Sequence, residues 1–166
     1  MSKTRRTNHT SGLLGVAVFQ TDSVKGEVVF IQRQGKTVEV NAEFFSLPAG
    51  KHGFHIHKAG DLRGEGCKGA CAHYHVGPPS THGDEPGNKG PRHTGDLGNL
   101  EMPKKGSLKK TWIVKDTTVR DLLGRSVIVH ADEDDLGLGG HEDSKSTGHS
   151  GARIACAIIG RAMSSC

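Results

Sequence analysis

The sequence contains few aromatic residues and no long hydrophobic run. Aromatic side chains make up 4% of the 166 residues, with one Trp and one Tyr. No apolar stretch approaches the roughly 18 residues that cross a membrane as a helix. The polar beginning, MSKTRRTNHTSG, lacks the apolar segment of a secretory signal peptide. We therefore expect a cytoplasmic protein with no membrane partner.

Extended helical periodicity is also missing, whereas glycine is abundant. The chain has 24 Gly, about twice the usual share. Eight β-branched or alternating runs are typical of strands: VAVF, EVVFIQR, TVEVNAEFF, HGFHIH, DLGNLEM, SLKKTWIVK, SVIVH and ARIACAIIG. The stretch TTVRDLLGR accommodates at most one helical turn. This pattern predicts an all-β fold, an eight-stranded antiparallel sandwich or barrel with two long functional loops at residues 58–94 and 131–151.

The chain length favours one domain that can bury a core of its own. We expect residues 1–12 to form a flexible, polar, basic tail and residues 13–166 to form the domain. The formal net charge of +4 is small and the basic clusters are short, which is typical of solvated loops. We therefore expect no nucleic-acid partner. A mild positive charge favours small anions as ligands.

Histidine is unusually frequent, with 11 in the chain. In HGFHIH, His55 and His57 are two residues apart, so a strand places both on one face. More histidines and Asp96 follow in the first long loop, which has no apolar periodicity, and His130 ends an apolar strand. Clustered histidines indicate metal binding. Exposed strand histidines and a disordered loop are the alternatives that the residues alone leave open.

Several segments carry a resemblance to a known family. GFHIH, GDLGNL with its upstream RH, VIVHADEDDLGLGG and TGHSGARIACAIIG resemble the signatures of Cu,Zn superoxide dismutases, and they occur in that family's order between about Gly15 and Gly160. The resemblance implies an eight-stranded Greek-key β-barrel. It also implies conversion of superoxide into dioxygen and hydrogen peroxide, with one copper ion and one zinc ion per chain.

The resemblance assigns the metal ligands residue by residue. It implies that copper is bound by His55, His57, His73 and His130, and zinc by His73, His82, His93 and Asp96, with His73 bridging the two ions. Asp134 would accept hydrogen bonds from His55 and His82 and so orient both rings, whereas the sequence alone would favour a surface carboxylate. His52 matches a structural histidine.

Two residues are expected to act on the substrate itself. Arg153, in SGARIAC, matches the family's active-site arginine and would hold the superoxide anion through charge-assisted hydrogen bonds. His73 would supply a proton during the second half of the redox cycle. The alternative for Arg153 is an ordinary strand arginine.

The second long loop resembles the segment that steers superoxide in the family. Glu142, Asp143 and Thr147 match that pattern, but Lys145 lies one residue earlier than the expected lysine. Asp132 replaces a second steering lysine. We therefore expect steering to be reduced, though still present.

The four cysteines have different expected roles. The resemblance pairs Cys67 with Cys156 in an intrasubunit disulfide, which would contribute about 4–5 kcal/mol in the chain-entropy model. Free thiols would be the default in the cytosol. Cys71 and Cys166 are expected to be free, although Cys71 could exchange with the nearby Cys67.

The remaining expectations concern minor histidines and partners. His75, His141 and His149 are expected to be solvated or hydrogen-bonded, with His75 also able to compete for a misplaced metal. The family favours a homodimer, but Ala59 and Arg161 stand where apolar contact residues are common. A copper chaperone is a candidate partner for copper delivery.

Two other functional classes compete with the enzyme. One is a non-enzymatic domain of the same fold, as found in copper chaperones, often with damaged copper sites. The other is a zinc-stabilised β-sandwich used as a binding module. The persistence of all four copper-type histidines together with Arg153 favours the enzyme.

Overall fold

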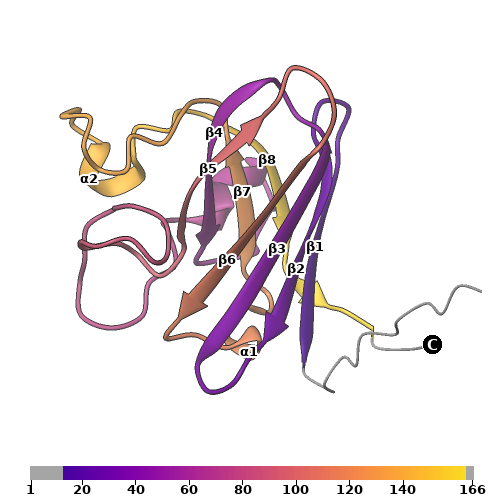
Figure 1. The fold of residues 1–166 in the computed structure, drawn as a ribbon, viewed down its shortest axis with the longest axis vertical. Helices are drawn as coiled ribbons and strands as arrows, with labels where there is room; N and C mark the ends of the chain where they lie inside the picture. Colours follow the sequence, from indigo (N-terminus) through magenta and orange to yellow (C-terminus); the bar gives the residue numbers. More distant parts are fainter. Residues whose placement is uncertain (1–12, 164–166) are drawn as a thin grey trace, which may run out of the picture.

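A computed structural model describes residues 13–163, which form nine strands in two antiparallel sheets (Figure 1). The larger sheet has the order β6-β3-β2-β1-β9, and these strands are Leu108–Lys115, Thr37–Ser46, Lys25–Gln32, Leu14–Gln20 and Gly160–Arg161. The smaller sheet has the order β5-β4-β7-β8, which are Asp96–Met102, Gly50–His57, Ser126–His130 and Arg153–Ile158. The chain crosses between sheets after β3, β5, β6 and β8, which confirms the predicted all-β Greek-key architecture.

The strand count differs from the expected eight because the last run is divided. At Ile159 the backbone leaves the ladder with β7: its N–H donates to the Arg125 carbonyl and its carbonyl accepts from the Gly124 N–H. The chain then joins the other sheet, where Gly160 and Arg161 pair with β1. One continuous apolar run thus serves both sheets.

Between the sheets lies one apolar core. Side chains of β3 alternate between buried and partly exposed, and those facing inward are Val38, Val40, Ala42 and Phe44. The few aromatic residues concentrate here. Ring centroids are 5.3 Å apart for Phe19 and Phe44, 5.9 Å for Phe44 and Phe54, and 5.6 Å for Phe54 and Trp112. Such contacts add to the stabilisation gained from area burial.

Strand β4 is buried on both faces, unlike the strands of the larger sheet. Phe54 and Ile56 face the core, and the alternate residues His55 and His57 are fully buried as well. The loops 58–95 and 131–152 lie on the same side of the molecule (Figure 1). Their coverage turns what would be a solvent face into a buried histidine-lined layer.

Within residues 13–163, three short helices lie in the segments that connect the strands. The expected helical turn is present as α1, Val119–Leu122, which Thr118 and Asp121 cap reciprocally. The loops also hold a 3₁₀ helix, Gly66–Ala70, and α2, Ser144–Thr147. These two were not predicted, because four or five residues are too few to show a helical period.

The expected basic tail, residues 1–12, lies outside the described residues, as does Cys166. Within residues 13–163, no helix has the length and apolarity to span a bilayer.

Candidate metal centre

The structure brings the predicted donors together in two groups that share His73. In each group the ligand atoms lie within 4.8 Å of one another; the first is His55, His57, His73 and His130, and the second is His73, His82, His93 and Asp96. Strand β4 supplies His55 and His57, the end of β7 supplies His130, and the start of β5 supplies Asp96. The other donors come from the loop 58–95, where His73 forms an isolated β-bridge with His57.

Hydrogen bonds fix the rings of the first group. His57 Nδ1 lies 2.8 Å from the Cys71 carbonyl, His130 Nδ1 lies 3.2 Å from the Gly151 carbonyl, and His55 Nε2 lies 2.7 Å from Asp134 Oδ2. These oxygens can only accept, so each of these nitrogens carries the proton. The opposite nitrogen of each neutral ring is left with a lone pair.

Those lone pairs have no hydrogen-bond partner within residues 13–163. The unpartnered buried atoms are His55 Nδ1, His57 Nε2, His73 Nε2, His93 Nδ1 and His130 Nε2. Buried polar atoms are almost always hydrogen-bonded, and each exception needs an explanation. A bound cation in each group explains all five, four in the first group and His93 Nδ1 in the second, because neutral imidazole nitrogens are metal donors.

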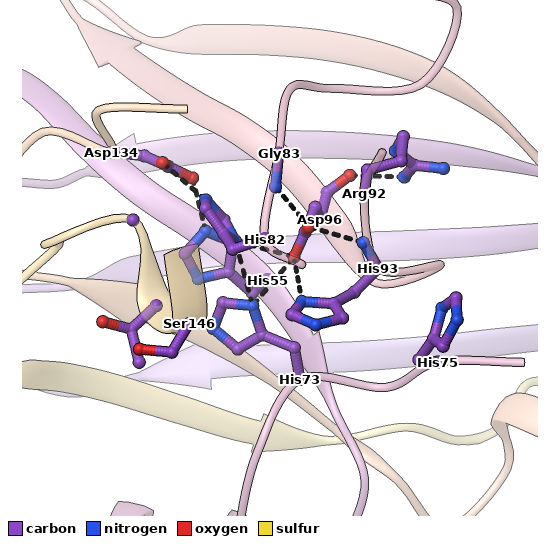
Figure 2. Close-up of polar contacts among 12 residues, drawn as sticks. His55, His73, His75, His82, Gly83, Arg92, His93, Asp96, Asp134 and Ser146 are labelled. Atoms are coloured by element: carbon purple, nitrogen blue, oxygen red, sulfur yellow. Dashed lines mark hydrogen bonds and ion pairs between the residues drawn. The ribbon is translucent and has the colours of Figure 1, made fainter. Parts of the chain in front are cut away.

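The second group surrounds one carboxylate oxygen. Asp96 Oδ1 lies 2.8 Å from His73 Nδ1, 3.0 Å from His82 Nδ1 and 3.4 Å from His93 Nδ1 (Figure 2). The nitrogens of His73 and His82 are 3.3 Å apart. Four ligands placed 2.0–2.1 Å from a tetrahedral zinc ion lie about 3.3 Å from one another. This cluster therefore has the dimensions of a closed zinc site.

The electrostatics of the two groups differ. Burial lowers the pKa of His57 to about 2 and that of His130 to about 4, so both rings are neutral donors at pH 7. Burial would also lower the pKa of His82, but hydrogen bonds to Asp134 and Asp96 outweigh it and raise the value to about 9. Burial would raise the pKa of Asp96, and hydrogen bonds from His73 and His82, together with the nearby ring of His93, lower it instead. The second group thus attracts positive charge.

Asp134 links the two groups. Its Oδ2 accepts from His55, and its Oδ1 lies 2.8 Å from His82 Nε2. Asn99, in β5, holds Asp134 in place: Asn99 Nδ2 donates to the Asp134 carbonyl and Asn99 Oδ1 accepts from its N–H. Asn99 was not singled out from the sequence, although it stands within GDLGNL, one of the motifs that carried the resemblance.

Arg92 is a second supporting residue that sequence reasoning did not single out. Its Nη2 lies 2.6 Å from the Asp96 carbonyl and 3.1 Å from the Thr94 carbonyl, and its Nε donates to the Asp84 carbonyl. These bonds tie the loop to the start of β5. In the sequence, the only indication of this role was that Arg92 directly precedes the predicted ligand His93.

Arg153 lies beside the first group at the start of β8. Its Nη1 donates to the Cys67 carbonyl and its Nη2 to the Cys71 carbonyl, each at 2.7 Å. The Cys71 carbonyl also accepts from His57. The predicted disulfide between Cys67 and Cys156 is present, with Cα atoms 5.7 Å apart. It fastens the 3₁₀ helix, and hence the carbonyls that hold Arg153, to β8.

A cavity of about 480 Å³ reaches the edge of the second group. It is lined by Lys58 and Lys145 and by the rings of His73 and His93. No acidic side chain of residues 13–163 lines it. The shifted lysine of the second loop therefore lies at an opening suited to anions.

Two further histidines contact backbone carbonyls. Both ring nitrogens of His52 lie 2.9 Å from backbone carbonyls, those of His130 and Pro48, which makes it a structural cross-link. His75 Nε2 lies 2.7 Å from the Pro78 carbonyl, and its ring stands apart from Asp96 (Figure 2).

The family follows from comparison with known proteins. Residues 24–159 match the family model described as copper/zinc superoxide dismutase. The chain belongs to this family. It is accordingly an oxidoreductase that converts superoxide into dioxygen and hydrogen peroxide, and its cofactors are copper and zinc.

Similar proteins span most of the chain. The extracellular Cu-Zn superoxide dismutase of Drosophila melanogaster is 44% identical over 89% of this chain and 82% of its own length. The Cu-Zn superoxide dismutase of Paramecium bursaria Chlorella virus 1 is 43% identical over 93% and 82%. The crystal structure of the clock protein EA4 superposes with a TM-score of 0.81 at 33% identity, covering 93% of this chain and 98% of that one.

Proposed function

We propose that the first group binds copper and the second binds zinc, one of each per chain. The observation that carries this assignment is the set of five buried, unpartnered imidazole nitrogens. The first group offers four imidazoles, three of them on strands β4 and β7, which suits copper. The second offers three imidazoles and a carboxylate at tetrahedral spacing, which suits zinc. His73 presents Nε2 to one group and Nδ1 to the other.

The bound copper supplies one-electron exchange with superoxide, and the protein supplies position and protons. We assign to Arg153 the binding of the superoxide anion, because its guanidinium is held next to the first group by two carbonyls. We assign to His73 Nε2 the holding and release of a proton. The Nδ1 side of its ring is fixed by Asp96, so Nε2 stays aimed at the first group.

The test is metal content and superoxide-dismutation activity measured on the same purified sample. We expect near one copper and one zinc per chain, and loss of activity in His130→Ala. Zinc alone, with no activity after copper is added, would support the non-enzymatic binding module instead. For Arg153, Arg153→Gln should raise KM for superoxide while both metals remain bound.

A homodimer and a copper chaperone are our proposals for partners. Ile158, at the end of β8, is 46% exposed and offers an apolar contact for a second copy. Sedimentation of the metal-loaded full chain tests the dimer, with a monomer at micromolar concentration as the contrary result. Copper uptake by the zinc-loaded chain, with and without a chaperone, tests the need for delivery.

The compartment is also a proposal. We retain the cytoplasm, and imaging of the tagged full chain tests it. Secretion is the alternative, since relatives from Drosophila melanogaster and Haemonchus contortus are named extracellular and the disulfide is typical of oxidising compartments.

A further inference from the structure

A pair of histidines lies on the second long loop, outside both metal groups. His141 and His149 stand on either side of α2, and their rings are stacked with centroids 3.7 Å apart and planes inclined by 10°. Both side chains are exposed. Neither residue belongs to the donor groups around His73. The copper and zinc sites therefore give no reason for this pairing.

One ring of the pair is oriented by a carboxylate. Asp143 Oδ1 lies 2.6 Å from His149 Nδ1. Because a carboxylate only accepts, His149 Nδ1 carries the proton, and Nε2 of the neutral ring keeps its lone pair. Metal-binding imidazoles are typically oriented in this way, with one nitrogen donating to a carboxylate and the other binding the ion. The same arrangement orients His55 on Asp134 in the first donor group.

The ring of the other histidine, His141, is available to bind a metal ion. Within residues 13–163, neither ring nitrogen of His141 forms a hydrogen bond, while its backbone N–H is held 2.9 Å from Ser144 Oγ. The other end of the turn is held as well, since the Thr147 N–H donates to the Asp143 carbonyl at 2.8 Å. One short turn thus fixes the backbone on both sides of the pair.

We propose that His141 and His149 form an exposed binding site for one divalent transition-metal ion, copper(II) or zinc(II), with Asp143 orienting His149. Imidazole suits both ions, and water completes the coordination. Two nitrogens bound to one tetrahedral ion at 2.0–2.1 Å lie about 3.3 Å apart. The lone pairs lie in the ring planes, so the exposed rings must turn out of the stack for both nitrogens to reach one ion. This ion is additional to the two in the buried centre.

The test is a zinc titration of protein that already holds copper and zinc, followed by metal analysis after gel filtration. We expect the chain to bind one more Zn²⁺ than His141→Asn/His149→Asn does. Asp143→Asn keeps both imidazoles and should weaken binding by about 10–100-fold. His75→Asn is the control, a half-buried histidine outside the pair, and should bind as many ions as the parent chain.

A second measurement needs no variant. Zn²⁺ should shift the ring NMR signals of His141 and His149 and leave those of His75 unchanged. Equal zinc binding by the parent chain and the double variant, or unshifted signals, would overturn the proposal. The metal content before titration reports on the buried copper and zinc sites. Failure of those sites is therefore distinguishable from failure of the exposed histidine pair to bind zinc.

Discussion

In both sheets of this molecule, successive side chains of a strand point to opposite faces, but the two sheets differ in whether the outer face is buried. In the larger sheet, β3 buries one face in the core and leaves the other partly exposed, with Phe45 57% exposed next to the buried Phe44. In the smaller sheet, β4 buries both faces, since the loops cover His55 and His57. Long loops without apolar periodicity thus create a second interior, which is lined by nitrogen donors instead of hydrocarbon.

The two interiors also differ in what holds them together. The apolar core is contiguous and is held mainly by packing of hydrocarbon side chains. The histidine interior depends on directed bonds: Asp134 to two rings, backbone carbonyls to His57 and His130, and a disulfide to the 3₁₀ helix. Substitutions in the apolar core should lower stability through the side-chain volume that they remove. Substitutions in the histidine interior should weaken metal binding because the rings lose the bonds that orient them.

The largest expected effect is on the shared apolar core. Phe54→Ala removes a fully buried ring that contacts Phe44 and Trp112, so the free energy of unfolding should fall by about 3–5 kcal/mol. Phe45→Ala, on the exposed face of β3, should change it by less than about 0.5 kcal/mol. Urea unfolding of the metal-loaded chain measures both. Equal losses would mean that the larger sheet is covered on its outer face too.

Loss of the disulfide should be the next largest effect. Cys67→Ser opens the link between the 3₁₀ helix and β8, and stability should fall by about 2–5 kcal/mol. Activity should fall as well, because the Cys67 carbonyl that holds Arg153 becomes mobile. Cys71→Ser is the control: it changes an exposed thiol and keeps the Cys71 carbonyl. Stability lost in the control but not in Cys67→Ser would contradict the assigned role of the disulfide.

A smaller effect is expected where orientation alone changes. Asp134→Asn is nearly isosteric, but its amide group cannot accept from both His55 and His82. Affinity for copper or zinc should fall by about 10–100-fold, as measured by competition with a chelator. Glu133→Gln, an exposed neighbour paired with Lys51, serves as control. Unchanged affinity in Asp134→Asn would show that packing alone orients the rings.

The contrast between the interiors also explains what the sequence could predict. Strand residues such as Val38 and Val40 follow the period of two, so the expected runs match the observed strands. The ninth strand was missed because Ile159 leaves its ladder through backbone bonds to Gly124 and Arg125. No side-chain pattern records that departure.

The same limit applies at the site. The seven donors are residue types with recognisable chemistry, and the structure brings all of them together. The rings of His57 and His130 are fixed by the backbone carbonyls of Cys71 and Gly151. Every residue has such a carbonyl, so the sequence does not show which ones take part. Asn99 and Arg92 act on backbone from distant or neighbouring segments, so their roles needed the fold.

The smallest expected effect concerns the approach of the anion to the histidine interior. Lys58 and Lys145 line the opening to His73, whereas Asp132 stands where a steering lysine was expected. Strong steering raises association by 10–10³-fold and falls steeply with salt. We expect the lower end of that range, so kcat/KM should fall less than about tenfold between low and physiological ionic strength. Lys58→Gln/Lys145→Gln should flatten this dependence, and Asp132→Lys should steepen it. A steep fall in the parent chain would mean that two lysines at the cavity replace the expected pair in full.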